Sequence, residues 1–163
     1  MPRYQAPLLQ AAVSTAFKSS GVLFVTSAVR ARRFNIYEYS LGQYGSLSST
    51  DSQMYYDVSR FVTTSLLAGT AVAANLNDLA DDISLALFTN AVTTELASLS
   101  AAGAGLNLVQ EAQNQRGTYR WTALETYDLL TAPATSLSGF DFRVQSISSG
   151  YTASMTGQVL YLE

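Results

Sequence analysis

The sequence predicts a single all-β domain built as an antiparallel β-sandwich. The clearest observation is the alternation over residues 139–146, where Phe140, Phe142 and Val144 share one face and polar side chains take the other. Residues 151–161 repeat this alternation. Such runs are typical of half-buried strands, and short strands separated by turn residues are typical of a sandwich or a barrel.

Two segments near the middle of the chain are expected to organise the rest. Residues 32–45 are rich in aromatic and β-branched residues, contain no proline, and carry glycines near their end, at positions 42 and 45. This composition suits a half-buried strand better than a helix. Residues 53–63 have the same character and follow after a short polar connection. Because so short a connection cannot carry a parallel crossover, the two segments are predicted to pair antiparallel.

Further short strands complete the predicted sandwich. Near the N-terminus, residues 10–18 and 21–29 are expected to be strands, with a turn at residues 19–21. The remaining strands are expected over residues 87–96, 107–113, 117–124, 139–146 and 151–161. Their regular spacing indicates one domain of the sandwich or barrel class.

One short helix is predicted in the long excursion that follows the central strands, over residues 78–85. Leu79 and Ile83 recur at near-helical spacing, and Asp78 suits the N-terminal cap. The aspartates at positions 81 and 82 suit the positive end of the helix dipole.

The first residues are predicted to form an extended arm, residues 1–9, with the sandwich domain spanning residues 10–163. Proline at positions 2 and 7 disfavours a helix and the interior of a sheet. Arginine and tyrosine, which lie between them, are enriched at protein interfaces. The arm is therefore expected to bind a partner; a frayed terminus is the alternative. The residues expected to make this contact are Pro2, Arg3, Tyr4 and Pro7.

The composition excludes several classes of function. A net charge of −3 argues against a nucleic-acid binder, which needs a basic face. Without histidine or cysteine, Ser-His-Asp and Cys-His catalysis, disulfides and the usual tetrahedral zinc sites are excluded. The apolar runs are shorter than the ~18 residues that cross a bilayer, and the N-terminal residues make a poor signal peptide. We therefore expect a soluble protein, made in the cytoplasm, with no membrane partner.

The low charge also indicates how the surface is used. Only 13% of the 163 residues are charged, against about 25% in typical globular domains. The surface must therefore consist largely of uncharged polar and tyrosine side chains. Such surfaces are common in proteins that pack against other subunits.

One polar cluster has the residue types of a calcium site. Its carboxylate and amide oxygens are the ligands that this cation prefers, but the glycine of an EF-hand loop is missing. Helix capping and solvation explain the cluster more simply, so no metal is expected. Its members are Asn75, Asn77, Asp78, Asp81 and Asp82.

Two charged groups have other possible roles. Glu38 and Asp57 lie on the two central strands, where they could face each other as in a glycosidase, but exposed side chains are the simpler interpretation. Arg30, Arg32 and Arg33 form a basic cluster that alternation divides between two faces. It is too small for a nucleic-acid site, so solvation or a salt bridge to a neighbouring subunit is expected.

Tyr119, Arg120 and Trp121 combine aromatic rings with a guanidinium group, which suits a ligand platform for sugars or proline-containing peptides. The alternative interpretation places Trp121 in the core of the sandwich, beside Tyr119. We favour the core position.

Several segments resemble one known group of proteins. The central strand reads RRFNIYEYS and leads to a glycine-containing turn, and the segments NAVTTE at residues 90–95 and NQRGTYRW at residues 114–121 extend the pattern, as does the loop at residues 75–82. In these segments the chain resembles small proteins that decorate or cement the heads of tailed bacteriophages. Many of those proteins form compact jelly rolls.

The resemblance implies a sandwich of the jelly-roll type and a structural role without enzymatic activity, catalytic residues or cofactors. The implied partner is the major capsid protein, on the outer surface of the phage head, with copies assembled as homotrimers on threefold axes. Each copy would bridge neighbouring capsid subunits. The alternative from another class is a carbohydrate-binding or adhesin-type module of a phage tail or fibre, which requires exposed aromatic residues near Trp121.

Overall fold

The structure, a computed structural model, describes residues 2–25, 33–44, 51–62, 69–76, 78, 80, 82, 84–90, 92, 107–125, 129–132, 138–148 and 153–163. These residues form twelve strands and no helix. The strands are β1 (Arg3–Val13), β2 (Lys18–Val25), β3 (Asn35–Tyr44), β4 (Gln53–Val62), β5 (Thr70–Val72), β6 (Asn75–Leu76), β7 (Ala86–Asn90), β8 (Asn107–Asn114), β9 (Tyr119–Thr122), β10 (Leu130–Thr131), β11 (Ser138–Ser146) and β12 (Ala153–Leu162).

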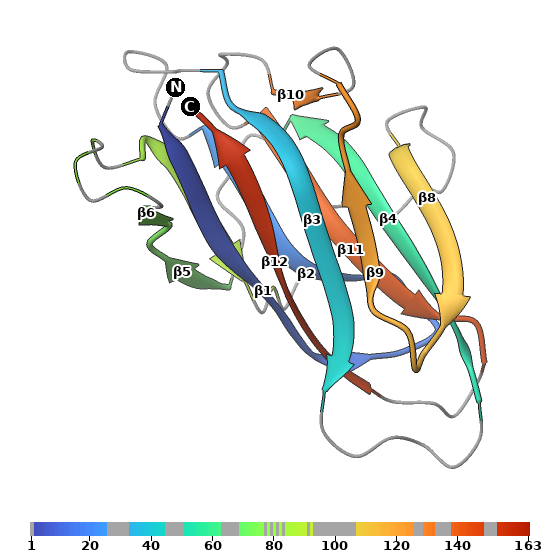
Figure 1. Ribbon diagram of the computed structural model, residues 1–163. Helices are drawn as coiled ribbons and strands as arrows, with labels where there is room; N and C mark the ends of the chain where they lie inside the picture. Colours follow the sequence, from blue (N-terminus) through green and yellow to red (C-terminus); the bar gives the residue numbers. More distant parts are fainter. Residues whose placement is uncertain are drawn as a thin grey trace.

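The strands form two six-stranded sheets that pack face to face (Figure 1). Sheet A has the order β10-β3-β12-β1-β6, with β9 also paired to β3. Sheet B has the order β5-β7-β2-β11-β4-β8. All the described strand pairs are antiparallel. The predicted antiparallel β-sandwich is therefore confirmed.

Aromatic side chains join the two sheets across the core. The ring of Tyr119, from sheet A, lies 5.3 Å from the ring of Tyr39 and 5.1 Å from that of Tyr56, which comes from sheet B. Phe34 and Phe140 meet edge to face at 5.8 Å, again between the sheets. Ring pairs of this kind contribute about 0.5–1.5 kcal/mol each beyond the burial of their area. Several tyrosines of the chain are therefore core residues rather than surface residues.

The predicted pairing of the two central segments is wrong. Both form strands near the expected bounds, but β3 lies in sheet A and β4 in sheet B. Their aromatic faces are buried against the opposite sheet, where Tyr39 of β3 and Tyr56 of β4 contact the same ring, that of Tyr119. A short connection excludes a parallel crossover, but it permits a crossing from one sheet to the other as well as a hairpin.

The predicted helix over residues 78–85 is absent from the described residues. The Asp78 carboxylate instead accepts a hydrogen bond from the Ala80 N–H at 2.9 Å, as in an Asx turn. Further along, the Ser84 hydroxyl and the next backbone N–H donate to the Glu163 carboxylate at 2.7 and 2.9 Å. A side chain that binds a nearby backbone N–H, as Asp78 does, competes with helix formation, and apolar spacing alone does not reveal this.

The predicted N-terminal arm is also wrong, because residues 3–13 form β1 inside sheet A. This strand pairs with β12 along its length and with β6 at Tyr4 and Gln5. Pro7 lies just beyond the short β6, and its carbonyl accepts a hydrogen bond from the Asn90 side chain at 3.1 Å. A strand tolerates proline at a position where no neighbouring strand would accept a hydrogen bond from the backbone N–H that proline lacks. The two prolines therefore did not exclude a strand.

The turn expected at residues 19–21 lies earlier in the chain, because β2 runs without a break through this segment. The turn between β1 and β2 spans residues 14–17. A Cβ atom on Gly21 would lie 2.4 Å from the Phe88 ring and 2.6 Å from the Leu8 side chain. This glycine therefore permits close packing of neighbouring strands rather than a turn.

The later strands lie where the sequence predicts them. Strands β8, β9, β11 and β12 correspond to the predicted segments 107–113, 117–124, 139–146 and 151–161. The segment predicted at residues 87–96 forms β7, and most of its remainder lies outside the described residues. The sequence SAAGAG at residues 100–105, which is typical of a flexible turn, lies outside them as well.

The two sheets differ in the exposure of their outer faces. Strands β2 and β11, in the middle of sheet B, are buried on both faces along nearly their whole length. Outside the main core, Val22, Phe24 and Phe61 form a second hydrophobic cluster together with Val92. Asp141 and Arg143 of β11, which alternation alone would place in solvent, are therefore buried.

A buried ion pair lies on this covered face of sheet B. Nη2 of Arg143 lies 2.6 Å from Oδ2 of Asp57, and Nε of the same arginine donates to that oxygen at 2.8 Å. The hydroxyl of Ser59 donates to that carboxylate, and the ring of Phe17 lies 4.6 Å from the guanidinium carbon. Beside this pair, the Ser19 hydroxyl donates to the Asp141 carboxylate. Buried charges require such pairing, because desolvation is otherwise uncompensated.

We predict that Asp57→Ala lowers the free energy of unfolding by about 3–5 kcal/mol, because it leaves the Arg143 guanidinium buried without its carboxylate. The matched control is Asp51→Ala, which breaks the exposed pair with Arg116 and should cost about 0–1 kcal/mol. Urea unfolding of both variants measures the difference. Equal losses of unfolding free energy in the two variants would show that the buried pair matters no more to stability than the exposed pair.

Two core tyrosines resist ionisation. Burial raises the pKa of Tyr39 well above its ordinary value, and the neighbouring Tyr119 hydroxyl adds to the shift. Burial likewise raises the pKa of Tyr161, although its hydrogen bond with Ser84 opposes the shift. In both cases the folded protein holds the phenolic proton more tightly than the unfolded chain does.

This difference predicts a loss of stability at alkaline pH. Stability is complete below the unfolded pKa of about 10 and falls as pH rises above it, by about 1.4 kcal/mol per pH unit for each such tyrosine. Tyr39→Phe removes one of these groups, so its free energy of unfolding should fall less steeply between about pH 10 and 12. Urea unfolding at several pH values measures the slope, and a slope equal to that of the wild type would contradict the assignment.

Candidate functional site

The outward face of sheet A is half-buried to exposed, in contrast to that of β2 and β11 in sheet B, and we call it the open face. Its members lie in register on neighbouring strands, and they alternate along β1 with the buried residues Tyr4, Ala6 and Leu8. The open face consists of Arg3, Gln5, Pro7 and Leu9 from β1, Glu38 and Ser40 from β3, Arg120 and Thr122 from β9, and Thr156, Gln158, Leu160 and Leu162 from β12.

The polar groups of the open face bind one another across the strands. Nε and Nη2 of Arg120 donate to the Glu38 carboxylate at 2.9 and 2.8 Å, and this contact raises the pKa of the guanidinium. The side-chain amide of Gln5 donates to that of Gln158 at 2.6 Å. Because these groups lie along the surface, the face offers a broad area of low net charge with half-buried leucines between the polar groups.

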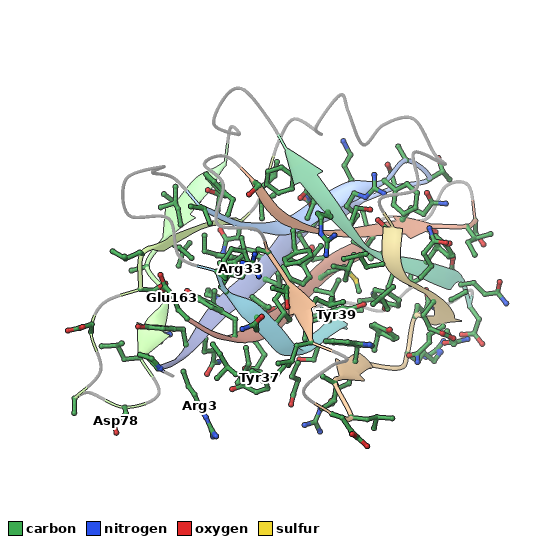
Figure 2. The ribbon with its side chains drawn as sticks, turned by 90° about the horizontal axis from the view of Figure 1, so that it is seen from above. Arg3, Arg33, Tyr37, Tyr39, Asp78 and Glu163 are labelled. Carbon is green, nitrogen blue, oxygen red and sulfur yellow. The ribbon has the colours of Figure 1, made fainter. Side chains whose placement is uncertain are left out.

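Three of the four residues predicted to bind a partner lie on or beside the open face. Arg3 is exposed on it, and Figure 2 shows its side chain extending away from the body of the protein. Pro7 is half-buried on the same face, while Pro2 precedes β1 and its carbonyl accepts a hydrogen bond from the Glu163 N–H. Tyr4 is different: it lies in the core, stacks on Tyr161, and donates its hydroxyl to a backbone carbonyl at 2.7 Å.

The structure separates the two carboxylates that were compared with a glycosidase pair. Glu38 lies on the open face of sheet A, whereas Asp57 is buried in the ion pair of sheet B. Arg33 is exposed, and the other two arginines of the basic cluster lie outside the described residues. No single site therefore unites the members of either group within the part of the chain that the structure describes.

The calcium cluster is only partly described. Asn75 pairs with β1 in sheet A, Asp78 closes the turn at Ala80, and Asp82 is exposed. The positions 77 and 81 lie outside the described residues. Within the described ranges, no three acidic side chains converge as metal ligands.

The aromatic pair on β9 belongs mainly to the core. Tyr119 is buried, and Trp121 is half-buried with its ring stacked on that of Tyr39 at 6.0 Å. The expected core position of Trp121 is thus confirmed in its packing, with one part of the ring left exposed. Arg120 points to the opposite face, where it binds Glu38. The three residues do not form one platform.

Sequence reasoning missed the open face because the arm prediction removed β1 from the sheet. The alternation of residues 3–9 was the available signal: Tyr4, Ala6 and Leu8 are apolar on one side, and polar residues and Pro7 lie on the other. The sequence contains no corresponding signal for the covered face of sheet B, since Asp141 and Arg143 look like solvent-facing residues in an alternating strand.

Comparisons with known proteins add no family to these observations: no family model, no curated protein and no solved structure matches the chain. None of the described residues belongs to a helix that is long and apolar enough to cross a membrane.

Proposed function

We propose that this protein is a structural decoration protein of a tailed-bacteriophage head, which binds the outside of the major capsid shell through the open face of sheet A. The observation that carries the proposal is the contrast between the two outer faces. The middle of sheet B, strands β2 and β11, is covered on both sides, whereas sheet A presents a broad surface of low net charge, with Leu160 and Leu162 half-buried in it. Between Arg3 and the pair of Arg120 with Glu38, the residues Gln5, Pro7, Gln158 and Leu160 carry no charge, and interface centres are likewise depleted of charged residues.

The strand order supports the jelly-roll form of this proposal. Eight main strands pair in nested fashion along the chain: β4 with β8, β3 with β9, β2 with β11 and β1 with β12. This nesting is what results when one long antiparallel ribbon is wound into two sheets, as in a jelly roll. The sequence resemblance to phage decoration proteins implies the same form.

The mechanism is cementing. A copy that spans two capsid subunits buries area on both, and this area exists only in the assembled shell. Ligand binding to one state stabilises that state by mass action, so the decorated shell resists dissociation more than the bare shell does. The exposed Arg3 at one corner of the open face supplies a charged contact at the rim of such an interface.

Copies are proposed to assemble as homotrimers, with each trimer on a threefold axis of the virion. A threefold axis brings three equivalent capsid edges together, and a cyclic trimer matches that symmetry. Most described charged side chains are engaged within the copy, as in the pairs of Arg116 with Asp51 and Arg120 with Glu38. Little charge is therefore left to oppose close contact between copies.

We predict that Thr156→Arg weakens binding to the shell about tenfold or more, because it adds an unpaired charge to the open face, beside the half-buried Leu9. The matched control is Ala112→Arg, on the exposed strand β8 of sheet B, which should bind as the wild type does. Co-sedimentation with expanded shells that lack the protein measures both affinities, and thermal unfolding checks that both variants fold.

Equal binding by the two variants would show that the open face is not the contact surface. If the wild-type protein itself does not sediment with shells but binds immobilised glycans, the decoration function is wrong and the adhesin alternative gains support.

A further inference from the structure

Sheet B ends on one side in a long edge strand, β8. Among the described strands, β8 pairs only with β4. Figure 1 shows it at the right-hand edge of the sandwich, with no labelled strand beyond it. The other edge strands of the described residues are much shorter than its 8 residues: β9 has 4, β5 has 3, and β6 and β10 have 2 each. Within the described part of the chain, β8 therefore presents the longest row of backbone N–H and C=O groups at a sheet edge.

This edge lacks most of the devices that keep exposed strands from pairing with other molecules. Proteins protect such edges with proline, lysine, inward-pointing charges, bulges or a covering segment. Residues 109–114 pair with β4 in unbroken register, and the irregularity lies before them, at Leu108. This regular stretch contains no proline and no lysine, and Glu111 is its single charged residue. Most of its side chains are exposed, so the strand is open to a partner.

We propose that β8 of one copy pairs antiparallel with β8 of a second copy, with Ala112 of each opposite Ala112 of the other. Identical strands that lie side by side across a two-fold axis run antiparallel, and the axis is normal to the sheet. Sheet B then continues from one copy into the next, and both open faces stay uncovered. The contact does not rest on the proposed shell binding. Because it is two-fold, it is also distinct from the threefold contact of the proposed homotrimer.

The sequence of β8 selects this register. A two-fold axis places one residue opposite itself, and the residues around it then pair in reverse order. An axis at Glu111 would bring two carboxylates together, and like charges directly opposite each other are destabilising. An axis at Gln110 would extend the pairing to Leu108, where the strand is irregular. An axis at Ala112 puts two small side chains at the centre and keeps the pairing within the regular residues 110–114.

The side chains that this register brings together match as donors and acceptors. Glu111 lies opposite the second copy's Gln113, whose amide N–H groups can donate to the carboxylate. Gln110 lies opposite the second copy's Asn114. Within one copy, Nε2 of Gln110 donates to the Asp57 carboxylate at 3.3 Å, and Oδ1 of Asn114 accepts from the backbone N–H two residues later at 2.9 Å. These bonds leave the Gln110 oxygen and the Asn114 amide nitrogen for the contact between copies. Such cross-strand pairs stabilise antiparallel sheets.

The chain contains no cysteine, so a single introduced cysteine can trap the contact selectively. Directly opposed residues of antiparallel strands have Cα atoms about 4.5–5.5 Å apart, within the range of about 4.4–6.8 Å that a disulfide requires. Under mild oxidation, Ala112→Cys should therefore form covalent dimers at least about tenfold faster than the matched control Glu111→Cys. Both positions are exposed, but residue 111 lies opposite residue 113 rather than opposite itself.

Non-reducing gels measure both rates at one protein concentration, and thermal unfolding checks that both variants fold. If Ala112→Cys dimers form no faster than Glu111→Cys dimers, both arise from random collision and the proposal is overturned. Faster cross-linking of Glu111→Cys would overturn it too, because that result places the axis at another residue.

A second measurement separates this contact from shell binding. Ala112→Arg places two guanidinium groups opposite each other at the axis, so the dissociation constant of the dimer should rise about tenfold or more. Thr156→Arg adds the same charge on the open face and should leave that constant within about twofold. Sedimentation equilibrium measures both constants. Equal effects of the two substitutions would contradict the proposal, as would a wild-type protein that shows no dimer at concentrations up to its solubility.

In the co-sedimentation test with shells, the same two variants exchange roles: Thr156→Arg should lose binding and Ala112→Arg should keep it. Failure of the contact between copies and failure of the decoration function are therefore distinguishable.

Discussion

The burial of β2 and β11, in the middle of sheet B, on both faces is the constraint on which the rest of the structure depends. Strands buried on both faces must satisfy the polar groups that they carry, and β11 brings Asp141 and Arg143 into that layer. The ion pair of Arg143 with Asp57, supported by Ser59 and stacked under Phe17, meets this requirement. Buried pairs of this kind contribute little net stability over apolar packing. Removal of one partner nevertheless destabilises the fold strongly, because the other charge stays buried without compensation.

The same constraint leaves sheet A as the surface that faces outward. Its central strands, β1 and β12, come from the two ends of the described chain, and they pair from Arg3 with Leu162 to Val13 with Ala153. The C-terminal Glu163 then binds the segment before β7 through Ser84 and the N–H beside it. One strand pair therefore supports the open face, and the residue that follows it fixes the segment before β7.

The sequence predicts strands well where one face is buried and the other is not. Alternation located β8, β9, β11 and β12, and it would have located β1 if Pro2 and Pro7 had been weighed against Tyr4, Ala6 and Leu8. It did not predict the pairing, because β3 and β4 have the same pattern whether they lie beside each other or across the core.

The candidate site was predictable only in part, for a physical reason. Arg3 and Pro7 were selected as interface residues and do lie on the open face, but as members of a strand rather than of an arm. Tyr4 was selected with them and is buried, since side chains of adjacent residues on a strand point to opposite faces. The burial of Asp57 and Arg143 depends on segments distant in the sequence, and local patterns do not contain that information.

Hydroxyl-radical footprinting of the protein bound to shells tests the central claim, that the open face is the contact surface, most directly. The half-buried leucines of that face, Leu9, Leu160 and Leu162, should lose reactivity on binding, whereas Leu108 on β8 should keep it. Protection of Leu108 with unchanged reactivity of the three leucines on the open face would contradict the account.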